Sequence, residues 1–173
     1  LQFVEAFKYL IANGFQIIIM GLPNEKVEWD FVHDDLIIYC NSGQQNVEND
    51  FYLVGFCEFL IGSKSGPIML PKIMGKPTLC LHASCLSTQN NKRNVKYYPK
   101  PIQSNGREVK LKEFLESDSY FDQSAESYIR NGYKTRDLTS EEVLEATQEF
   151  LEYYNKDEWV GVKKERKVLE KMV

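Results

Sequence analysis

Residues 59–67 read Phe59-Leu60-Ile61-Gly62-Ser63-Lys64-Ser65-Gly66-Pro67. The apolar run over 59–62 predicts a buried strand, and the small polar residues over 63–66 predict a loop. Proline is favoured at the first position of a helix and glycine just past its end, so we expect a helix from Pro67 to Met74, followed by Gly75. A strand, loop and helix in this order bring the chain to the carboxyl edge of a parallel sheet, where open α/β proteins bind ligands.

The loop over 63–66 has the composition of an anion-binding site. The N–H groups at a helix start attract anions, and Gly66 would let a phosphate approach the backbone closely. The hydroxyl groups of Ser63 and Ser65 can donate hydrogen bonds, and Lys64 adds a positive charge. A simpler interpretation is that Ser65 only caps the helix and Gly66-Pro67 only form a turn, and the pattern alone favours neither. The loop is neither a Walker A sequence nor G-x-G-x-x-G, which disfavours a Rossmann dehydrogenase.

Strand and helix signals alternate on both sides of this loop. Apolar and β-branched runs predict strands over 15–20, 36–40 and 78–82, the first of them buried on both faces. Apolar spacing and capping signals predict helices over 1–12, 50–59, 111–116, 120–131 and 139–154. Asp50 would cap the second of these helices or complement its dipole, and Thr139 or Ser140 would cap the last. The long polar segment over 83–110 predicts a functional or mobile loop. This pattern indicates an α/β fold with a central parallel sheet flanked by helices.

The composition fits one globular domain and limits the classes of function. The 173 residues carry 25 acidic and 21 basic side chains, so the net charge of −4 gives no broad attraction to nucleic acid. The four cysteines form no C-x-x-C pair and only two histidines are present, so we expect reduced thiols in a cytosolic protein and no zinc site. No apolar run reaches the roughly 18 residues of a membrane span. No basic region precedes the first apolar stretch, so we expect no signal peptide, and the start at Leu1 without a methionine indicates a fragment of a longer protein or a trimmed product.

One block of the chain matches a known pattern. It comprises Asn49 to Leu53, Cys57 to Ser63, Ser65-Gly66-Pro67 and Gly75-Lys76-Pro77, and it resembles a family of bacterial glycosyltransferases associated with surface-polysaccharide synthesis. The similarity covers residues 1–154, which would be the carboxyl-terminal half of such an enzyme. The resemblance implies a GT-B architecture, in which two Rossmann-like domains face a cleft and the second holds the donor nucleotide. Residues 1–155 would then form a Rossmann-like three-layer α/β/α domain with a mostly parallel sheet, and residues 156–173 a charged terminal helix packed on it or extending from it.

The resemblance also assigns residues to the donor site. The donor diphosphate would face the loop residues, which are Ser63, Lys64, Ser65, Gly66 and Pro67. Other candidates for the cleft are Gly21, Asn41, Ser42, His82 and Lys100. Of these, Gly21 would permit close approach at a neighbouring strand end, and Lys100 could neutralise phosphate charge.

Two positions depart from the pattern of the family. A basic residue usually stands where this chain has Ile19, and an acidic residue where it has Ile38. An Arg–Asp pair has thus become an Ile–Ile pair, so neither full activity nor the usual donor follows from the resemblance.

Three further patterns allow more than one interpretation. His82 ends a predicted strand at the ligand edge and could contact the donor, relay a proton or fill a structural hydrogen-bonding role. The basic and aromatic run over 91–100 could grip nucleotide phosphates or RNA, or form a solvated loop. Asp34-Asp35 and Glu48-Asn49-Asp50 could suggest a metal, but they are more typical of loop charges and helix caps. We expect no metal and no cofactor, the nucleotide sugar being a substrate.

Pattern and resemblance together predict the nucleotide-sugar-binding domain of a glycosyltransferase that transfers a sugar to a glycan or lipid-linked acceptor. The general base would lie in a missing amino-terminal domain, so no catalytic residue is named and the isolated chain would be inactive. The alternatives are a sugar-nucleotide epimerase or hydrolase of the same fold, and a non-catalytic remnant that binds a partner or a nucleotide. We expect a cytoplasmic protein without nucleic-acid partners, associated at most peripherally with the inner face of the membrane.

Overall fold

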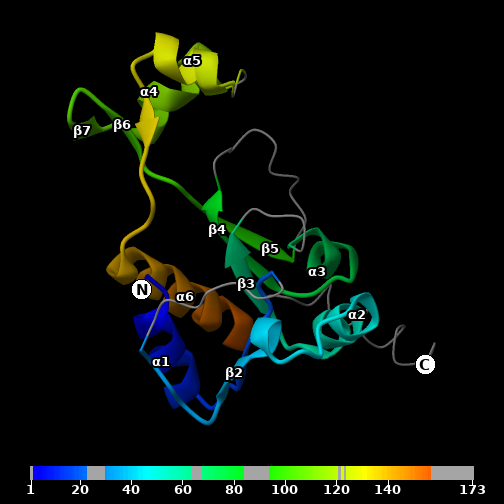
Figure 1. Ribbon diagram of the computed structural model, residues 1–173. Helices are drawn as coiled ribbons and strands as arrows, with labels where there is room; N and C mark the ends of the chain where they lie inside the picture. Colours follow the sequence, from blue (N-terminus) through cyan, green and yellow to red (C-terminus); the bar gives the residue numbers. More distant parts are fainter. Residues whose placement is uncertain are drawn as a thin grey trace.

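The computed structural model describes residues 2–22, 30–63, 68–83, 94–120, 122 and 124–156. Two parallel sheets and the helices around them form the body of the molecule, and a smaller antiparallel part stands apart from this body (Figure 1). The protein therefore has an α/β fold with parallel sheets, as the alternating strand and helix signals predict. Within the described ranges, no helix is both long enough and apolar enough to cross a bilayer.

The larger parallel sheet contains three strands in the order β3-β4-β5. Their bounds are Leu60–Ser63 for β3, Thr78–Ala83 for β4 and Val95–Pro99 for β5. The central strand β4 contributes Leu79 and Leu81 to one core cluster and Cys80 and Ala83 to the other. Strands buried on both faces are typical of parallel sheets, because their crossover helices pack on each side.

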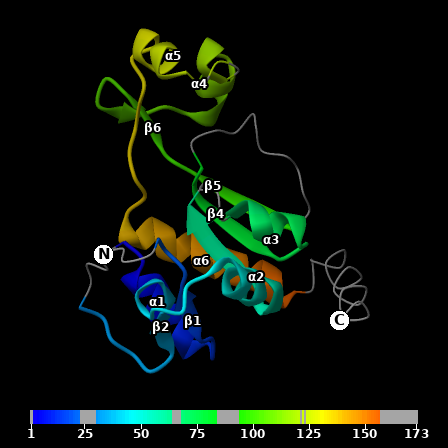
Figure 2. The same ribbon diagram turned by 45° about the vertical axis from the view of Figure 1, so that its right-hand side comes forward.

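Helices cover both faces of this sheet. On one face, α1 (Val4–Ala12) and α6 (Ser140–Asn155) pack against each other (Figure 2). They share a core cluster with β4, which consists of Ala6, Leu79, Leu81, Leu138, Val143, Ala146 and Phe150. On the other face, Ile68 packs with Cys80, Ala83 and Val95, and the short helix α3 (Met69–Ile73) follows it and contacts Tyr97 through Lys72.

The smaller parallel sheet pairs β1 (Ile17–Ile19) with β2 (Leu36–Ile38). Both strands are shorter than predicted, and Tyr39–Asn41 form the 3-10 turn η1 instead of continuing β2. Ile18 and Ile37 are register partners and are 37% and 40% exposed, so the expectation that the first strand is buried on both faces is wrong. A β-branched run reports strand propensity, whereas burial depends on what packs against the sheet.

The structure confirms the predicted start of one helix and places the start of another at a different residue. The start of α6 is confirmed, because Thr139 and Glu142 form a capping box. Helix α2 (Val47–Phe56) begins earlier than the predicted helix over 50–59, since the Asn46 side chain accepts a hydrogen bond from the Asn49 N–H at 2.8 Å. Asn46 therefore caps α2 in place of Asp50, and Asp50 lies in the first turn, where its charge complements the helix dipole as the second interpretation expected. The predicted helix start at Pro67 and the predicted terminal helix over 163–173 lie outside the described residues.

The polar segment over 83–110 is not one long loop. It contains β5, β6 (Ile102–Ser104) and β7 (Arg107–Glu108), while residues 84–93 lie outside the described part. The sequence of β5 includes polar residues because β5 lies at the edge of its described sheet. Its residues from Lys96 on are only half-buried. Asn105 and Gly106, with φ of 51° and 76°, form the tight turn between β6 and β7. An Asn-Gly dipeptide is a strong hairpin signal, so this turn was visible in the sequence.

Residues 102–135, which we call the appended module, form the part that stands apart in Figures 1 and 2. In it, β6 pairs antiparallel with β7 and with β8 (Lys134–Thr135). Its helical elements are α4 (Leu111–Leu115), the 3-10 turn η3 (Asp118–Tyr120) and α5 (Ala125–Arg130). The buried Phe114 ring contacts the rings of Tyr120, Tyr128 and Tyr133. The module thus has a small core of its own.

Candidate functional site

Three of the predicted site residues lie at the carboxyl edge of the larger parallel sheet. Ser63 ends β3 and is the register partner of Leu81, the neighbour of His82 in β4. Ala83 ends β4 and is the register partner of Pro99, and the Lys100 N–H donates to the Ala83 carbonyl at 3.1 Å. The three adjacent strands therefore bring Ser63, His82 and Lys100 together, at the edge where parallel sheets bind ligands.

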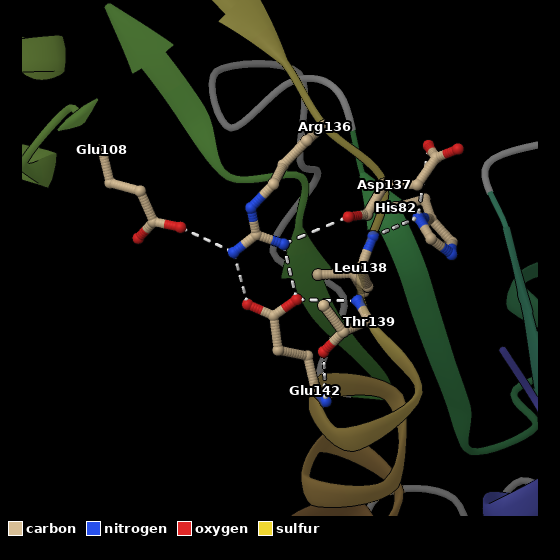
Figure 3. A network of polar contacts seen from close by, with 7 residues as sticks. All are labelled: His82, Glu108, Arg136, Asp137, Leu138, Thr139 and Glu142. Carbon is tan, nitrogen blue, oxygen red and sulfur yellow. Dashed lines mark hydrogen bonds and ion pairs between the residues drawn. The ribbon is translucent and has the colours of Figure 1, made fainter. Parts of the chain in front are cut away.

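His82 lies at an irregularity of β4. Between two register pairs, the step from Cys80 to Ala83 on β4 spans three residues and the step from Tyr97 to Pro99 on β5 spans two. The extra residue makes a bulge, and His82 adopts a left-handed backbone conformation with φ of 52°. Bulges re-aim side chains, and this one directs the imidazole toward the segment before α6 (Figure 3).

The imidazole of His82 is held by that segment. Its Nδ1 accepts a hydrogen bond from the Leu138 N–H at 3.4 Å and lies 3.8 Å from the Asp137 carboxylate. Because Nδ1 accepts from a group that can only donate, the neutral ring carries its proton on Nε2. Burial of the side chain lowers the pKa of His82, an effect that Asp137 opposes and Lys100 reinforces. His82 is thus a neutral, oriented side chain near neutral pH.

Lys100 pairs with Asp137 rather than standing free at the edge. Its ammonium group lies 2.5 Å from the Asp137 carboxylate, and this contact with Lys100 lowers the pKa of Asp137. The lysine side chain is 29% exposed and the aspartate 60%. Solvent screens a pair this exposed, so an anionic ligand could exchange with Asp137 for the lysine.

Arg136 connects the appended module with the body (Figure 3). Its guanidinium group binds both carboxylate oxygens of Glu142, each at 2.7 Å, and Glu108 of β7 at 2.6 Å. Glu142 in turn accepts from the Thr139 N–H at 2.8 Å as part of the capping box. The Arg136 contact lowers the pKa of Glu142 to about 2. This network fixes the segment that carries Asp137 and Leu138, and with it the surroundings of His82.

Sequence reasoning missed Arg136 and Asp137. The predicted helix start at Thr139 or Ser140 included Glu142 in its acidic first turn, but no local signal linked Arg136 to Glu108 or Asp137 to Lys100. These contacts join residues 28 and 37 positions apart. They depend on how the module is joined to the sheet, which short motifs do not report.

Gly21, Asn41 and Ser42 lie at the carboxyl end of the other parallel sheet, β1–β2. Gly21 has φ of 33°, and its carbonyl and that of Met20 accept hydrogen bonds from the Gln45 amide at 3.0 and 3.2 Å. The Ser42 hydroxyl donates to the Tyr39 carbonyl at 2.7 Å and closes the turn after β2. Asn41 ends η1 and is exposed. These residues thus belong to a different sheet from Ser63, His82 and Lys100.

Ile19 and Ile38 are direct register partners at the ends of β1 and β2. Residues that face each other in neighbouring strands interact through their side chains, so a basic and an acidic residue there would form an ion pair. In this chain the same position holds an apolar pair, which cannot contribute charge to the edge of the sheet.

The remaining predicted residues of the phosphate loop, Lys64, Ser65, Gly66 and Pro67, lie outside the described residues. In the part of the chain that the structure covers, no group of three or more His, Cys, Asp or Glu residues could hold a metal ion. The thiol of Cys40 is free and buried. Comparisons with protein-family models, with curated proteins and with solved structures gave no match to this chain.

Proposed function

We propose that this chain contains the donor-binding domain of a glycosyltransferase with a GT-B architecture. The observation that carries the proposal is the meeting of Ser63, His82 and Lys100 at the carboxyl ends of three adjacent parallel strands. A Rossmann-like domain binds a nucleotide at such an edge. The strand, loop and helix signals over 59–74 and the resemblance of residues 49–77 to bacterial glycosyltransferases point in the same direction.

In this proposal the edge binds the diphosphate of a nucleotide sugar. Lys100 supplies positive charge, Ser63 a hydroxyl donor, and the predicted loop of Lys64, Ser65 and Gly66 supplies backbone N–H groups. The charge that develops on the leaving diphosphate during sugar transfer is stabilised by these groups. An amino-terminal domain holds the glycan or lipid-linked acceptor and supplies the general base. The enzyme works in the cytoplasm, and the chain by itself has no transferase activity.

Calorimetry of the intact protein with UDP, GDP and their sugars tests the proposal. We expect weak but measurable binding, and we expect Lys100→Met to weaken it about tenfold, or by about 1.4 kcal/mol, because a charge-assisted contact is lost. Ser65→Ala and Gly66→Val should also weaken binding. Lys8→Met is the matched control, since Lys8 pairs with Glu5 on the exposed face of α1 and should leave the affinity unchanged. Intact protein that binds none of these nucleotides would refute the donor site.

A second candidate is a non-catalytic module that still binds a nucleotide. The observation that favours it is the Ile19–Ile38 register pair, which replaces a charged pair at the end of β1 and β2. Turnover assays of the full-length protein with a panel of donors separate the candidates. Transfer of sugar to an acceptor supports the transferase, release or isomerisation of the sugar supports the hydrolase or epimerase alternative, and binding without turnover supports the module.

A further inference from the structure

His82 lies near two opposite charges, those of Asp137 and Lys100, at the proposed diphosphate site. Its Nδ1 lies 3.8 Å from the Asp137 carboxylate, which is itself paired with the Lys100 ammonium group. The groups packed around the imidazole are Asp137 and Leu138 before α6, Lys100 after β5, and the Phe3 ring next to α1 at 6.3 Å between ring centroids. The charge of His82 therefore depends on whether Lys100 stays with Asp137.

In this structure, the groups around His82 favour the neutral imidazole. Burial disfavours the charged imidazole, the lysine repels it, and the Leu138 N–H occupies Nδ1. The Asp137 carboxylate is the one attractive group among those named, and the Lys100 charge acts against it. A change in the position of the Lys100 charge therefore changes the pKa of His82.

A phosphate-bearing ligand changes this balance in one direction. When the phosphate oxygens bind the Lys100 ammonium group, the lysine no longer offsets the negative charge of Asp137. The phosphate also adds negative charge of its own. Both effects favour a positive imidazole. On protonation, Nδ1 gains a proton from solvent and turns from acceptor to donor, so it releases the Leu138 N–H and faces the Asp137 carboxylate.

We propose that a phosphate-bearing ligand bound at Lys100 is taken up together with a proton, which His82 receives on Nδ1. This inference rests on the proposed donor site and adds its regulation. Because linkage is reciprocal, the ligand binds more tightly as pH falls through the titration range of His82. A shift of one pKa unit in His82 corresponds to about tenfold in affinity between the two limits of pH.

Histidine NMR titration with UDP as the probe tests the coupling directly. The chain contains two histidines, and His33, which is paired with Asp35 on an exposed segment, serves as the internal control. Saturating UDP should raise the pKa of His82 by about half a unit to one unit, whereas the ring signals of His33 should not respond to UDP. The Leu138 amide signal should shift along with His82 protonation, because that N–H loses its acceptor.

Two variants make the test independent of UDP. Lys100→Met should raise the pKa of His82 without any ligand, and added UDP should then have little further effect. Asp137→Asn should lower the pKa of His82 and reduce the response to UDP. Unchanged backbone amide spectra elsewhere would show that both variants fold.

The outcomes separate the inference from the proposed function. If calorimetry detects no UDP binding, both the donor site and the inference fail. If UDP binds and the His82 titration stays where it was, the donor site stands and the inference is overturned. A His82 titration that Lys100→Met leaves unchanged would overturn the inference as well.

Discussion

The carboxylate of Glu142 binds the amino terminus of α6 and the Arg136 guanidinium group at the same time. It accepts hydrogen bonds from the Thr139 N–H at 2.8 Å and from both terminal nitrogens of Arg136 at 2.7 Å. One side chain therefore completes a helix cap and holds the segment that positions Asp137 and Leu138. Its loss should affect both stability and the surroundings of His82.

Replacement of Glu142 by glutamine should lower the free energy of unfolding by about 1–2 kcal/mol, because the charged contact with Arg136 is lost. Thr139→Ala should cost about 1 kcal/mol, since it removes only the other half of the capping box. Urea unfolding at neutral pH measures both changes. Equal stability of Glu142→Gln and the wild type would contradict the role assigned to this carboxylate.

The pH dependence of stability provides a second measurement on Glu142. Arg136 holds the pKa of Glu142 at about 2 in the folded protein, below the usual 4.5, so the unfolded chain binds a proton at higher pH than the folded one. The stabilising contribution is therefore complete above about pH 4.5 and is lost as pH falls toward 2. Glu142→Gln should flatten the stability profile over this range. The wild-type and variant profiles would run parallel if the contact did not exist in solution.

At the scale of secondary-structure elements, features that depend on neighbouring residues were predicted more accurately than features that depend on residues far apart in the sequence. The start of α6 at Thr139 and the strand over 59–62 were predicted from neighbouring residues, and the structure has both, although β3 at Leu60–Ser63 is only partly buried and not the buried strand that was expected. The bulge at His82 was not predictable, because it arises from the pairing of β4 with β5, whose residues were assigned to a loop. The polar residues of β5 hid the strand, since an edge strand is covered less completely than a central one.

The turn at Asn105-Gly106 determines whether the β6–β7 hairpin forms. Gly106 has φ of 76°, and an added Cβ would meet no atom within 4 Å, so the cost of Gly106→Ala is backbone strain alone. We expect about 1–2 kcal/mol of destabilisation and faster hydrogen exchange in β6 and β7. Gly62→Ala is the matched control, because Gly62 does not have this conformation and its Cβ would make ordinary contacts, the nearest at 3.5 Å. Equal exchange in the two variants would contradict the assigned turn.

At the scale of the whole molecule, two connecting segments join the appended module to the body. They are residues 99–101 and 136–138, and the Lys100–Asp137 pair and the Arg136 N–H to the Pro101 carbonyl at 3.2 Å tie them together. The orientation of the module therefore depends on charged contacts at the same edge that we propose as the ligand site. The sequence predicted an α/β fold with parallel strands, but it did not show the module, because that arrangement follows from pairing between β6 and β8.

Arg136→Lys should loosen the module without unfolding it. Lysine keeps the charge but cannot bind Glu142 through two nitrogens and Glu108 at once, so the link between module and body weakens by about 1–2 kcal/mol. Residual dipolar couplings of module and body amides should then no longer fit one orientation. Arg107→Lys is the control, because Arg107 pairs with Glu113 inside the module and its loss should leave the orientation unchanged.

The central claim is that the carboxyl edge of β3-β4-β5 binds the diphosphate of a nucleotide sugar. The most direct measurement is the map of backbone amide shifts when a UDP or GDP sugar is added to the intact protein. We predict the largest shifts at Ser63, at His82 and Ala83, and at Lys100, with small shifts in α5. Shifts that cluster on the appended module, or no shifts at all at saturating concentrations of these donors, would contradict the account.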